Sequence, residues 1–219
     1  MTRTDHLPVT EAHLPLARTL AGLLDVRFAL GARAHTVIGI GGESGSGKSV
    51  TAAALGRVLA ERGLPTRLLH QDDWFRLPPR ANHEARERDI THVGPSEVNT
   101  EALQAMMEAF RAGASDVPAP LLDFPGNRFL TQHYDFAGCR VLLIEGTYVL
   151  GMAGLDVRIF LAATHEDAVA QRMERAREVE TPFITRVLAI EHALIAPYGA
   201  TADIVVDRRF QVVRPAAGS

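Results

Sequence analysis

The sequence predicts an α/β fold built on a parallel β-sheet. Short apolar runs alternate with longer amphipathic segments along most of the chain, which is the pattern of strands that alternate with helices. Each apolar run is continuous, which is typical of strands buried on both faces, as in parallel sheets covered by helices. The chain has 219 residues and is 47% hydrophobic, so it is long enough to bury the core of one ordinary domain.

Five apolar runs are predicted as the strands of this sheet. Their continuous apolar character favours a parallel arrangement, because strands that face water on one side alternate between apolar and polar residues. They are Thr36–Gly42, Thr66–Gln71, Arg140–Gly146, Val157–Ala163 and Ala202–Asp207.

Helices are predicted between and around these strands, where apolar residues recur at helical spacing. They are Glu11–Leu30, Lys48–Arg62, Thr100–Ala112, His165–Arg177 and Pro182–Ile195. We expect residues 1–34 to form an N-terminal helical extension that packs on a domain of residues 35–219. The segment Leu77–Asn99 contains charges and prolines without clear periodicity. Because it is long for a structureless connection, it is predicted to be a substrate loop at about residues 77–99.

Composition and charge argue against several classes of partner. The formal net charge is -3 and there is no block of like charges, so nucleic acid is not an expected partner. The single cysteine, Cys139, cannot form an internal disulfide, which fits a reducing compartment. No run approaches the roughly 18 apolar residues of a membrane span, and the N-terminus lacks the apolar stretch of a signal peptide. We therefore expect a cytoplasmic protein that does not bind membranes.

The segment GESGSGKS, Gly42–Ser49, fits the phosphate-binding loop pattern G-x-x-x-x-G-K-[ST]. It follows a predicted buried strand and precedes a predicted helix, which is the context that this loop requires. Its glycines allow backbone amides to point at phosphate oxygens, and the helix N-terminus adds a partial positive charge. Lys48 is expected to bridge the β- and γ-phosphates, and the Ser49 hydroxyl can ligate Mg²⁺. The predicted residues of this nucleoside triphosphate site are Gly42, Ser44, Gly45, Ser46, Gly47, Lys48, Ser49 and Val50.

Acidic residues lie at the ends of two predicted strands. Asp72 and Asp73 follow Thr66–Gln71, and Glu145 lies near the end of Arg140–Gly146. The carboxyl ends of parallel strands form the edge at which ligands bind in doubly wound sheets. An aspartate there can orient or deprotonate an acceptor hydroxyl, and Glu145 can hold Mg²⁺ through water. The alternative for each is a capping or turn carboxylate.

Three arginines lie late on the helix predicted at His165–Arg177: Arg172, Arg175 and Arg177. Arg172 and Arg175 are three residues apart and therefore share a helix face. Guanidinium groups at such a position could neutralise charge on phosphates in the transition state. The alternative is a solvated helix face, for which alternating arginine and glutamate are typical.

Taken in order, GESGSGKS, QDDWF, LLIEGTY, the arginine helix and EHALIAPYGATADIVVD resemble the uridine kinase and phosphoribulokinase superfamily of P-loop kinases. The resemblance runs from about Thr36 to Asp207 and extends to nicotinamide riboside kinase. It implies the P-loop kinase fold, with a five-stranded parallel sheet and helices on both faces. It also implies ATP, Mg²⁺ and phosphorylation of a small-molecule hydroxyl, on a nucleoside or riboside before other alcohols, by a protein that can form a homo-oligomer.

The same resemblance implies roles for individual residues. Asp72 matches the general base and Arg172 a lid residue that completes a catalytic set with Lys48, while Arg175 is expected to contact the nucleotide. Ser49 and Glu145 are the expected metal ligands. The residues expected near the acceptor are Asp73, Trp74, Phe75, Arg88, Asp123, Arg128 and Tyr148.

The chain departs from the uridine kinase pattern in two places. Uridine kinases carry an aromatic–Asp–His–Pro segment whose aspartate binds the ribose hydroxyls, whereas THVGPSEVN has Val93 or a neighbour at that place. They also carry Tyr-Asp-Phe ahead of a histidine that recognises the pyrimidine, whereas LLDFPGNR has Leu122 for the tyrosine and no histidine before Arg128. A pocket without these polar groups gains little by binding a pyrimidine, so uridine and cytidine are predicted to be poor substrates.

Two other functions stay open beside a riboside kinase. One is a kinase for another alcohol, such as pantothenate, a sugar phosphate or glycerate. Arg80, Arg86 and Arg88 could then hold the second anion of the acceptor. The other is a nucleotide-binding regulatory ATPase, which would need neither a hydroxyl-orienting Asp72 nor an arginine helix.

Overall fold

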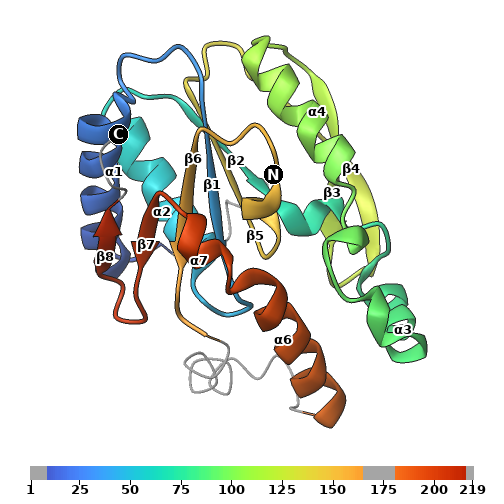
Figure 1. Ribbon diagram of the computed structural model, residues 1–219. Helices are drawn as coiled ribbons and strands as arrows, with labels where there is room; N and C mark the ends of the chain where they lie inside the picture. Colours follow the sequence, from blue (N-terminus) through green and yellow to red (C-terminus); the bar gives the residue numbers. More distant parts are fainter. Residues whose placement is uncertain (1–8, 165–180, 216–219) are drawn as a thin grey trace.

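The computed structural model describes residues 9–164 and 181–215, and its central sheet has the strand order β2-β5-β1-β6-β7-β8 (Figure 1). Adjacent strands from β2 to β7 pair in parallel. The predicted α/β class and the parallel arrangement are therefore confirmed. The five predicted strands are β1 (Thr36–Gly42), β2 (Thr66–His70), β5 (Val141–Gly146), β6 (Val157–Leu161) and β7 (Ile204–Val206).

The predicted number of five strands is wrong, because β8 (Val212–Pro215) adds a sixth strand to the described sheet, antiparallel to β7. The chain reverses at Asp207, whose Oδ1 accepts hydrogen bonds of 2.9 Å from the backbone N–H groups of Arg209 and Gln211. The sequence of this edge strand has only two consecutive apolar residues, too few to show a strand pattern.

A separate antiparallel hairpin is also absent from the sequence prediction. It consists of β3 (Val117–Asp123) and β4 (Arg128–Tyr134), which form a sheet of their own. Prolines at positions 118 and 120 argue against a strand in the sequence, and they are tolerated because a two-stranded sheet has only edge strands. The hairpin packs on the rest of the core through Ala119 and Tyr134.

The segment predicted as a substrate loop at residues 77–99 is largely helical. It contains the helix α3 (Pro79–Arg88) and two 3-10 turns, Ile90–His92 and Pro95–Glu97. Proline suits the first turn of α3, where its missing N–H is not needed. The side of α3 that faces the protein is polar, with Asn82 as its one buried residue. An apolar stripe is therefore missing, which is why the sequence shows no helical periodicity here.

The remaining predicted helices that fall in described residues are present with small shifts. Glu11–Leu30 is a 3-10 turn followed by α1 (Leu14–Phe28). The others are α2 (Lys48–Glu61), α4 (Thr100–Arg111) and α6 (Pro182–Ile195), with a short α7 (Tyr198–Thr201) after α6. The helix predicted at His165–Arg177 lies outside the described residues. No helix within residues 9–164 and 181–215 is both long and apolar enough to span a membrane.

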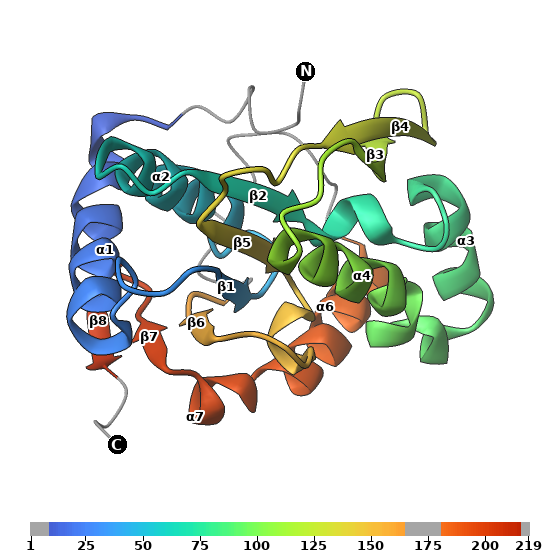
Figure 2. The ribbon, with the colours of Figure 1, turned by 90° about the horizontal axis from the view of Figure 1, so that it is seen from above.

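Helices cover both faces of the sheet, as Figure 2 shows from above. Successive residues of each buried strand contribute to two cores: Ile38 and Ile40 pack with α1 and α2, whereas Val37 packs with α4 and the residues after β5. This alternation explains the continuous apolar runs, since both sides of each strand are buried.

Glycines in β1 allow the segment after β5 to approach the sheet closely. A Cβ on Gly41 would lie 2.5 Å from Cγ of Leu150, in the 3-10 turn η6 (Val149–Gly151). β1 and β5 end together, with Gly41 opposite Gly146, and His70 at the end of β2 lies opposite Glu145. Three neighbouring parallel strands thus present their carboxyl ends at one edge of the sheet.

Candidate active site

The phosphate loop lies at this edge, between the end of β1 and the start of α2. Gly45 and Gly47 have φ angles of +83° and +89°, which side chains with a Cβ rarely adopt. Lys48 is buried, and its Nζ donates a 2.7 Å hydrogen bond to the carbonyl oxygen of Glu43. Ser46 is also buried, and its Oγ has no hydrogen-bond partner among the described residues. The loop therefore has the backbone geometry that turns amides inward, together with its lysine close by.

A serine, a glutamate and a histidine meet beside the loop. The Ser49 hydroxyl donates a 3.0 Å hydrogen bond to Oε1 of Glu145, and Nδ1 of His70 lies 2.7 Å from the same oxygen. Burial acts to raise the pKa of Glu145, but the hydrogen bond and charge of His70, the charge of Lys48 and the Ser49 hydroxyl hold it below its usual range. The Glu145 side chain is therefore a buried carboxylate.

His70 is a site residue that sequence reasoning missed. It is 2% exposed and ends the apolar strand β2. A polar residue at the end of an otherwise apolar buried strand is the signal that could have identified it.

Asp72 stands two residues beyond His70, in the 3-10 turn η3 (Gln71–Trp74), and is half-buried. The turn is fixed by its neighbours. Oε1 of Gln71 accepts a 2.9 Å hydrogen bond from the N–H of Tyr148, and a Cβ on Gly146 would lie 2.3 Å from the Cβ of Gln71. The absence of a side chain at Gly146 thus lets Gln71 lie against the end of β5, which holds Asp72 at the carboxyl edge.

The other residues of the QDDWF segment are packed into the protein. Asp73 is 1% exposed, and its Oδ1 accepts a 2.8 Å hydrogen bond from the backbone N–H of Leu122 in β3. Trp74 is buried, and Phe75 forms an isolated antiparallel bridge with Val98. These contacts give Asp73 and Trp74 positions in the core, so Asp72 is the better placed of the two aspartates to meet a substrate.

The remaining predicted acceptor residues lie on three different parts of the chain: α3, the β3–β4 hairpin and the segment after β5. Asp123 and Arg128 face each other across the hairpin, where Nε of Arg128 lies 3.0 Å from Oδ2 of Asp123. Arg128 is exposed. Arg88 is exposed, and its Nε donates to the backbone carbonyl of Glu84. Tyr148 is buried beside charged groups, and burial, followed by the charges of Glu191 and Glu97, raises its pKa. The predicted residues Arg172, Arg175 and Arg177 lie outside the described residues.

A buried group of charged side chains, here called the Arg86 cluster, joins α3 to α6 and consists of Arg86, Glu97 and Glu191. Nε of Arg86 donates to Oε1 of Glu97, and Nη2 donates to Oε2 of Glu97 at 2.9 Å and to Oε1 of Glu191 at 3.1 Å. Glu97 is 0% exposed and also accepts hydrogen bonds from Asn82 and the Gly94 N–H, both at 2.8 Å. Neither glutamate was predicted, because no local pattern marks residues that meet Arg86 across 11 positions, as Glu97 does, or across 105, as Glu191 does.

The helix α6 also contacts the phosphate loop. Nδ1 of His192, the residue after Glu191, lies 2.6 Å from Oε1 of Glu43. Burial raises the pKa of Glu191 and the charge of Glu97 adds to this effect, while the charges of Arg86 and Lys48 act in the opposite direction. The Arg86 cluster therefore lies within electrostatic reach of the phosphate-loop lysine.

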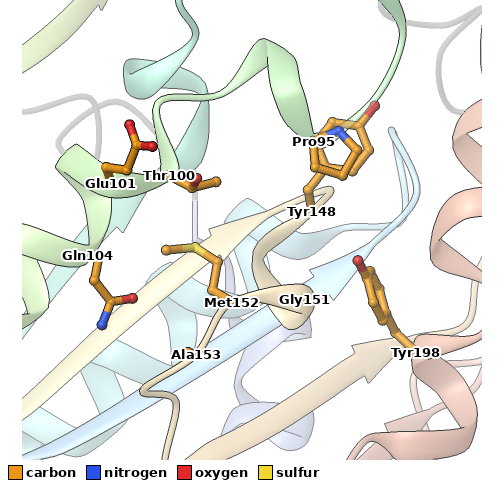
Figure 3. Close-up of a pocket in the computed structure, with 9 residues that line it drawn as sticks. All are labelled: Pro95, Thr100, Glu101, Gln104, Tyr148, Gly151, Met152, Ala153 and Tyr198. Carbon is orange, nitrogen blue, oxygen red and sulfur yellow. The ribbon is translucent and has the colours of Figure 1, made fainter. Parts of the chain in front are cut away.

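A hollow of about 440 Å³ opens beside α4 and η6 (Figure 3). Its walls come from the start of α4, residues 151–153, Pro95, Tyr148 and Tyr198. Its lining includes no residue of the phosphate loop and neither Asp72 nor Glu145. The hollow is therefore distinct from the edge where the loop, Ser49 and Glu145 meet. Tyr148 lines the hollow and also lies beside the charges of the Arg86 cluster.

Several known proteins are similar to this chain in sequence. The sequence model described as the Phosphoribulokinase / Uridine kinase family matches residues 37–210. The chain is 27% identical over 188 residues to the bifunctional alpha-galactosidase/sucrose kinase AgaSK of Mediterraneibacter gnavus, a match that covers 80% of this chain but only 20% of that protein. It is 24% identical over 183 residues to a uridine kinase of Leuconostoc citreum (strain KM20), covering 78% of this chain and 86% of that one.

A solved structure shares the fold. The crystal structure of a "putative fructose transport system kinase" from Silicibacter sp. TM1040 superposes with a TM-score of 0.61 and 24% sequence identity, covering 86% of this chain and 94% of that chain.

Proposed function

The chain belongs to the phosphoribulokinase and uridine kinase family of small-molecule kinases, and we propose that it transfers the γ-phosphate of ATP to a hydroxyl group of a riboside or a sugar. One observation carries the proposal. The phosphate loop, the Ser49–Glu145 pair and Asp72 all lie at the carboxyl edge of adjacent parallel strands, so nucleotide, metal and acceptor can meet there.

In this proposal the loop binds the triphosphate. Inward-turned amides and the N-terminus of α2 attract the phosphate oxygens. Lys48 exchanges the Glu43 carbonyl for the β- and γ-phosphates and follows the developing charge during transfer. His192 and Glu43 hold α6 against the loop.

Ser49 and Glu145 fit a Mg²⁺ site. They offer a hydroxyl and an ionised carboxylate 3.0 Å apart, which are the hard oxygen donors that Mg²⁺ prefers. Within residues 9–164 and 181–215 there is no group of three or more metal-binding side chains. The site therefore suits an ion held by few protein ligands and by phosphates, as Mg²⁺ often is. Bound Mg²⁺ would neutralise charge on the phosphate oxygens, and His70 would orient the Glu145 carboxylate toward it.

Asp72 is proposed to orient the acceptor hydroxyl and to take its proton. Its carboxylate is half-buried on a turn fixed by Gln71. A positioned general base of this kind contributes about 10²- to 10⁴-fold to the rate. The role of Arg172 and Arg175 in closing over the phosphates stays a prediction from the sequence.

The choice of a riboside or sugar rests on the family and on the residues near the acceptor. One relative is a uridine kinase and another contains a sucrose kinase, both of which act on hydroxyl-rich compounds. Val93 is buried and apolar, and Leu122 donates its backbone N–H to Asp73. Neither offers the polar groups that would recognise a ribose or a pyrimidine, so a free sugar is as good a candidate as a nucleoside. The proposal includes a reducing cytoplasmic compartment, which the buried thiol of Cys139 supports.

The test is acceptor-dependent formation of ADP by the purified protein with Mg²⁺ and ATP. The panel contains uridine, cytidine, nicotinamide riboside, sucrose, fructose, pantothenate and glycerate. We expect at least one hydroxyl-rich compound to stimulate ADP formation and to be recovered as a phosphate ester. ADP formation that no acceptor changes would instead favour the regulatory ATPase.

Lys48 offers an independent check of nucleotide binding, because it is the only lysine in the sequence. Reductive methylation then modifies one side chain besides the α-amino group. We expect ATP with Mg²⁺ to protect Lys48 from modification in a peptide map, and equal modification with and without ATP would contradict the assignment of the loop.

A further inference from the structure

We propose that the acceptor is uncharged, a sugar or riboside without a phosphate or carboxylate group. The inference rests on the proposed function and narrows its acceptor. It depends on Arg86, the buried cation of residues 77–99, which the sequence predicts to be a substrate loop. The contacts of Arg86 within the Arg86 cluster decide whether it can bind an anion.

The Arg86 cluster connects that segment to α6, the helix that contacts the phosphate loop. Arg86 is on α3, and Glu191 is on α6 next to His192, which contacts Glu43 of the loop. The two helices also meet at His83 and Phe183, whose ring centroids are 5.3 Å apart. An acceptor that reaches the γ-phosphate from this side therefore comes under the influence of the charges in the cluster.

Arg86 is fully engaged with carboxylates. Its side chain is 16% exposed and contacts both oxygens of Glu97 and one oxygen of Glu191. To bind an anion of the acceptor, it would have to leave Glu97, which is 0% exposed. That would leave a buried carboxylate without a counter-charge, which is strongly unfavourable.

The cluster as a whole is not positive. It contains two carboxyl groups and one guanidinium group, so its net charge is negative when Glu191 is ionised and zero when Glu191 is protonated. A phosphate or carboxylate on the acceptor would be repelled by a negative cluster. At a neutral cluster it would find a cation that is already paired with carboxylates. Either mismatch lowers the affinity for a charged acceptor.

The other arginines described in and around this segment lie at the surface, outside the buried cluster. Arg80 and Arg88 are exposed on α3. Arg76 is 3.5 Å from Glu101, and Arg128 is 3.0 Å from Asp123, so each already has a carboxylate partner at the surface. Within residues 75–99, Arg86 is thus the arginine that is mostly buried, and it is committed to the cluster.

The experiment compares acceptors that differ in one charged group. The pairs are fructose with its 1- and 6-phosphates, glycerol with glycerate, and pantothenyl alcohol with pantothenate. Both fructose phosphates are included so that one of them leaves the reacting hydroxyl free. We expect the uncharged member of each accepted pair to have the higher kcat/KM, by on the order of 10²-fold.

A variant identifies the source of this preference. At a pH at which Glu191 is ionised, Glu191→Gln removes one negative charge and keeps the side-chain shape, so kcat/KM for the charged member should rise by about tenfold relative to the uncharged one. Glu61→Gln is the matched control, because Glu61 is exposed on α2 and paired with Arg57. Glu61→Gln should leave unchanged the ratio of kcat/KM for the charged member to kcat/KM for the uncharged member. Thermal unfolding of both variants verifies that they are folded, and the wild-type comparison tests the proposal even if Glu191→Gln does not fold.

Each result has a definite meaning. Preference for the charged members in the wild type would overturn the inference while leaving the kinase function intact. A ratio unchanged in folded Glu191→Gln would overturn the assignment of selectivity to the Arg86 cluster. Failure of every compound, charged or uncharged, to be phosphorylated would overturn the proposed function and this inference with it.

Discussion

Replacing each aspartate of the QDDWF segment by asparagine should separate catalysis from stability. Asp72 is half-buried at the sheet edge, so Asp72→Asn keeps the shape and removes only proton acceptance. We expect kcat to fall by on the order of 10²-fold or more, with unchanged affinity for a non-hydrolysable ATP analogue. Its melting temperature should stay within a few degrees of wild type, since partly exposed sites contribute little to stability.

Asp73→Asn should instead lower the stability of the protein and leave its turnover largely unchanged. The Asp73 carboxylate is 1% exposed and accepts a 2.8 Å hydrogen bond from the Leu122 N–H. Weakening a buried charge-assisted hydrogen bond costs about 1–3 kcal/mol, and at this chain length each kcal/mol lowers the melting temperature by about 2–4 °C. The melting temperature should therefore fall by about 2–12 °C, while the folded enzyme keeps most of its turnover.

The two variants are compared by acceptor-dependent ADP formation, with the best compound of the panel at saturating ATP, and by thermal unfolding. A large loss of turnover in Asp73→Asn together with near-normal turnover in Asp72→Asn would refute the assignment of Asp72 as the base.

Lys48→Ala should lose measurable transfer and weaken ATP binding in calorimetry, because no other lysine exists to replace it; near-wild-type turnover would contradict the phosphate-loop assignment. Glu145→Gln, without metal, should lower the free energy of unfolding by about 3–5 kcal/mol at neutral pH. The folded-state pKa of Glu145 lies below its ordinary 4.5, so the stabilisation is present above that pH and is lost as the pH falls through the folded-state value. The difference from wild type in urea unfolding should therefore shrink in acid, and a difference that grows would show that the sign is wrong. For uridine, kcat/KM should stay below about 10⁴ M⁻¹s⁻¹, and a higher value in steady-state assays would show that other residues recognise the base.

Features encoded in short stretches could be predicted from the sequence. The continuous apolar runs identified all five parallel strands, because burial on both faces leaves a local pattern. The GESGSGKS motif specified a loop between β1 and α2. The helix α6 has the bounds that the sequence predicts, Pro182–Ile195. The carboxyl-edge positions of Asp72 and Glu145 followed from the strand ends.

Features that depend on distant partners could not. The strand β8 is too short to show a period, and the prolines of β3 conceal a hairpin. The helix α3 buries a polar side, so it lacks an apolar stripe. Arg86 meets Glu191 across 105 residues, and His70 meets Glu145 across 75. A sequence names such residues but does not show which pairs will meet.

Phosphoryl transfer to a small molecule is tested most directly by following the phosphate group itself. ATP that carries heavy oxygen on its γ-phosphate is incubated with the protein, Mg²⁺ and the best uncharged acceptor. The products are then separated and identified by mass spectrometry. We expect a phosphate ester of the acceptor that contains the heavy oxygens, in an amount equal to the ADP formed, and we expect no such ester with Lys48→Ala. Recovery of the label only in inorganic phosphate would contradict the claim that this protein is a kinase of a small uncharged alcohol.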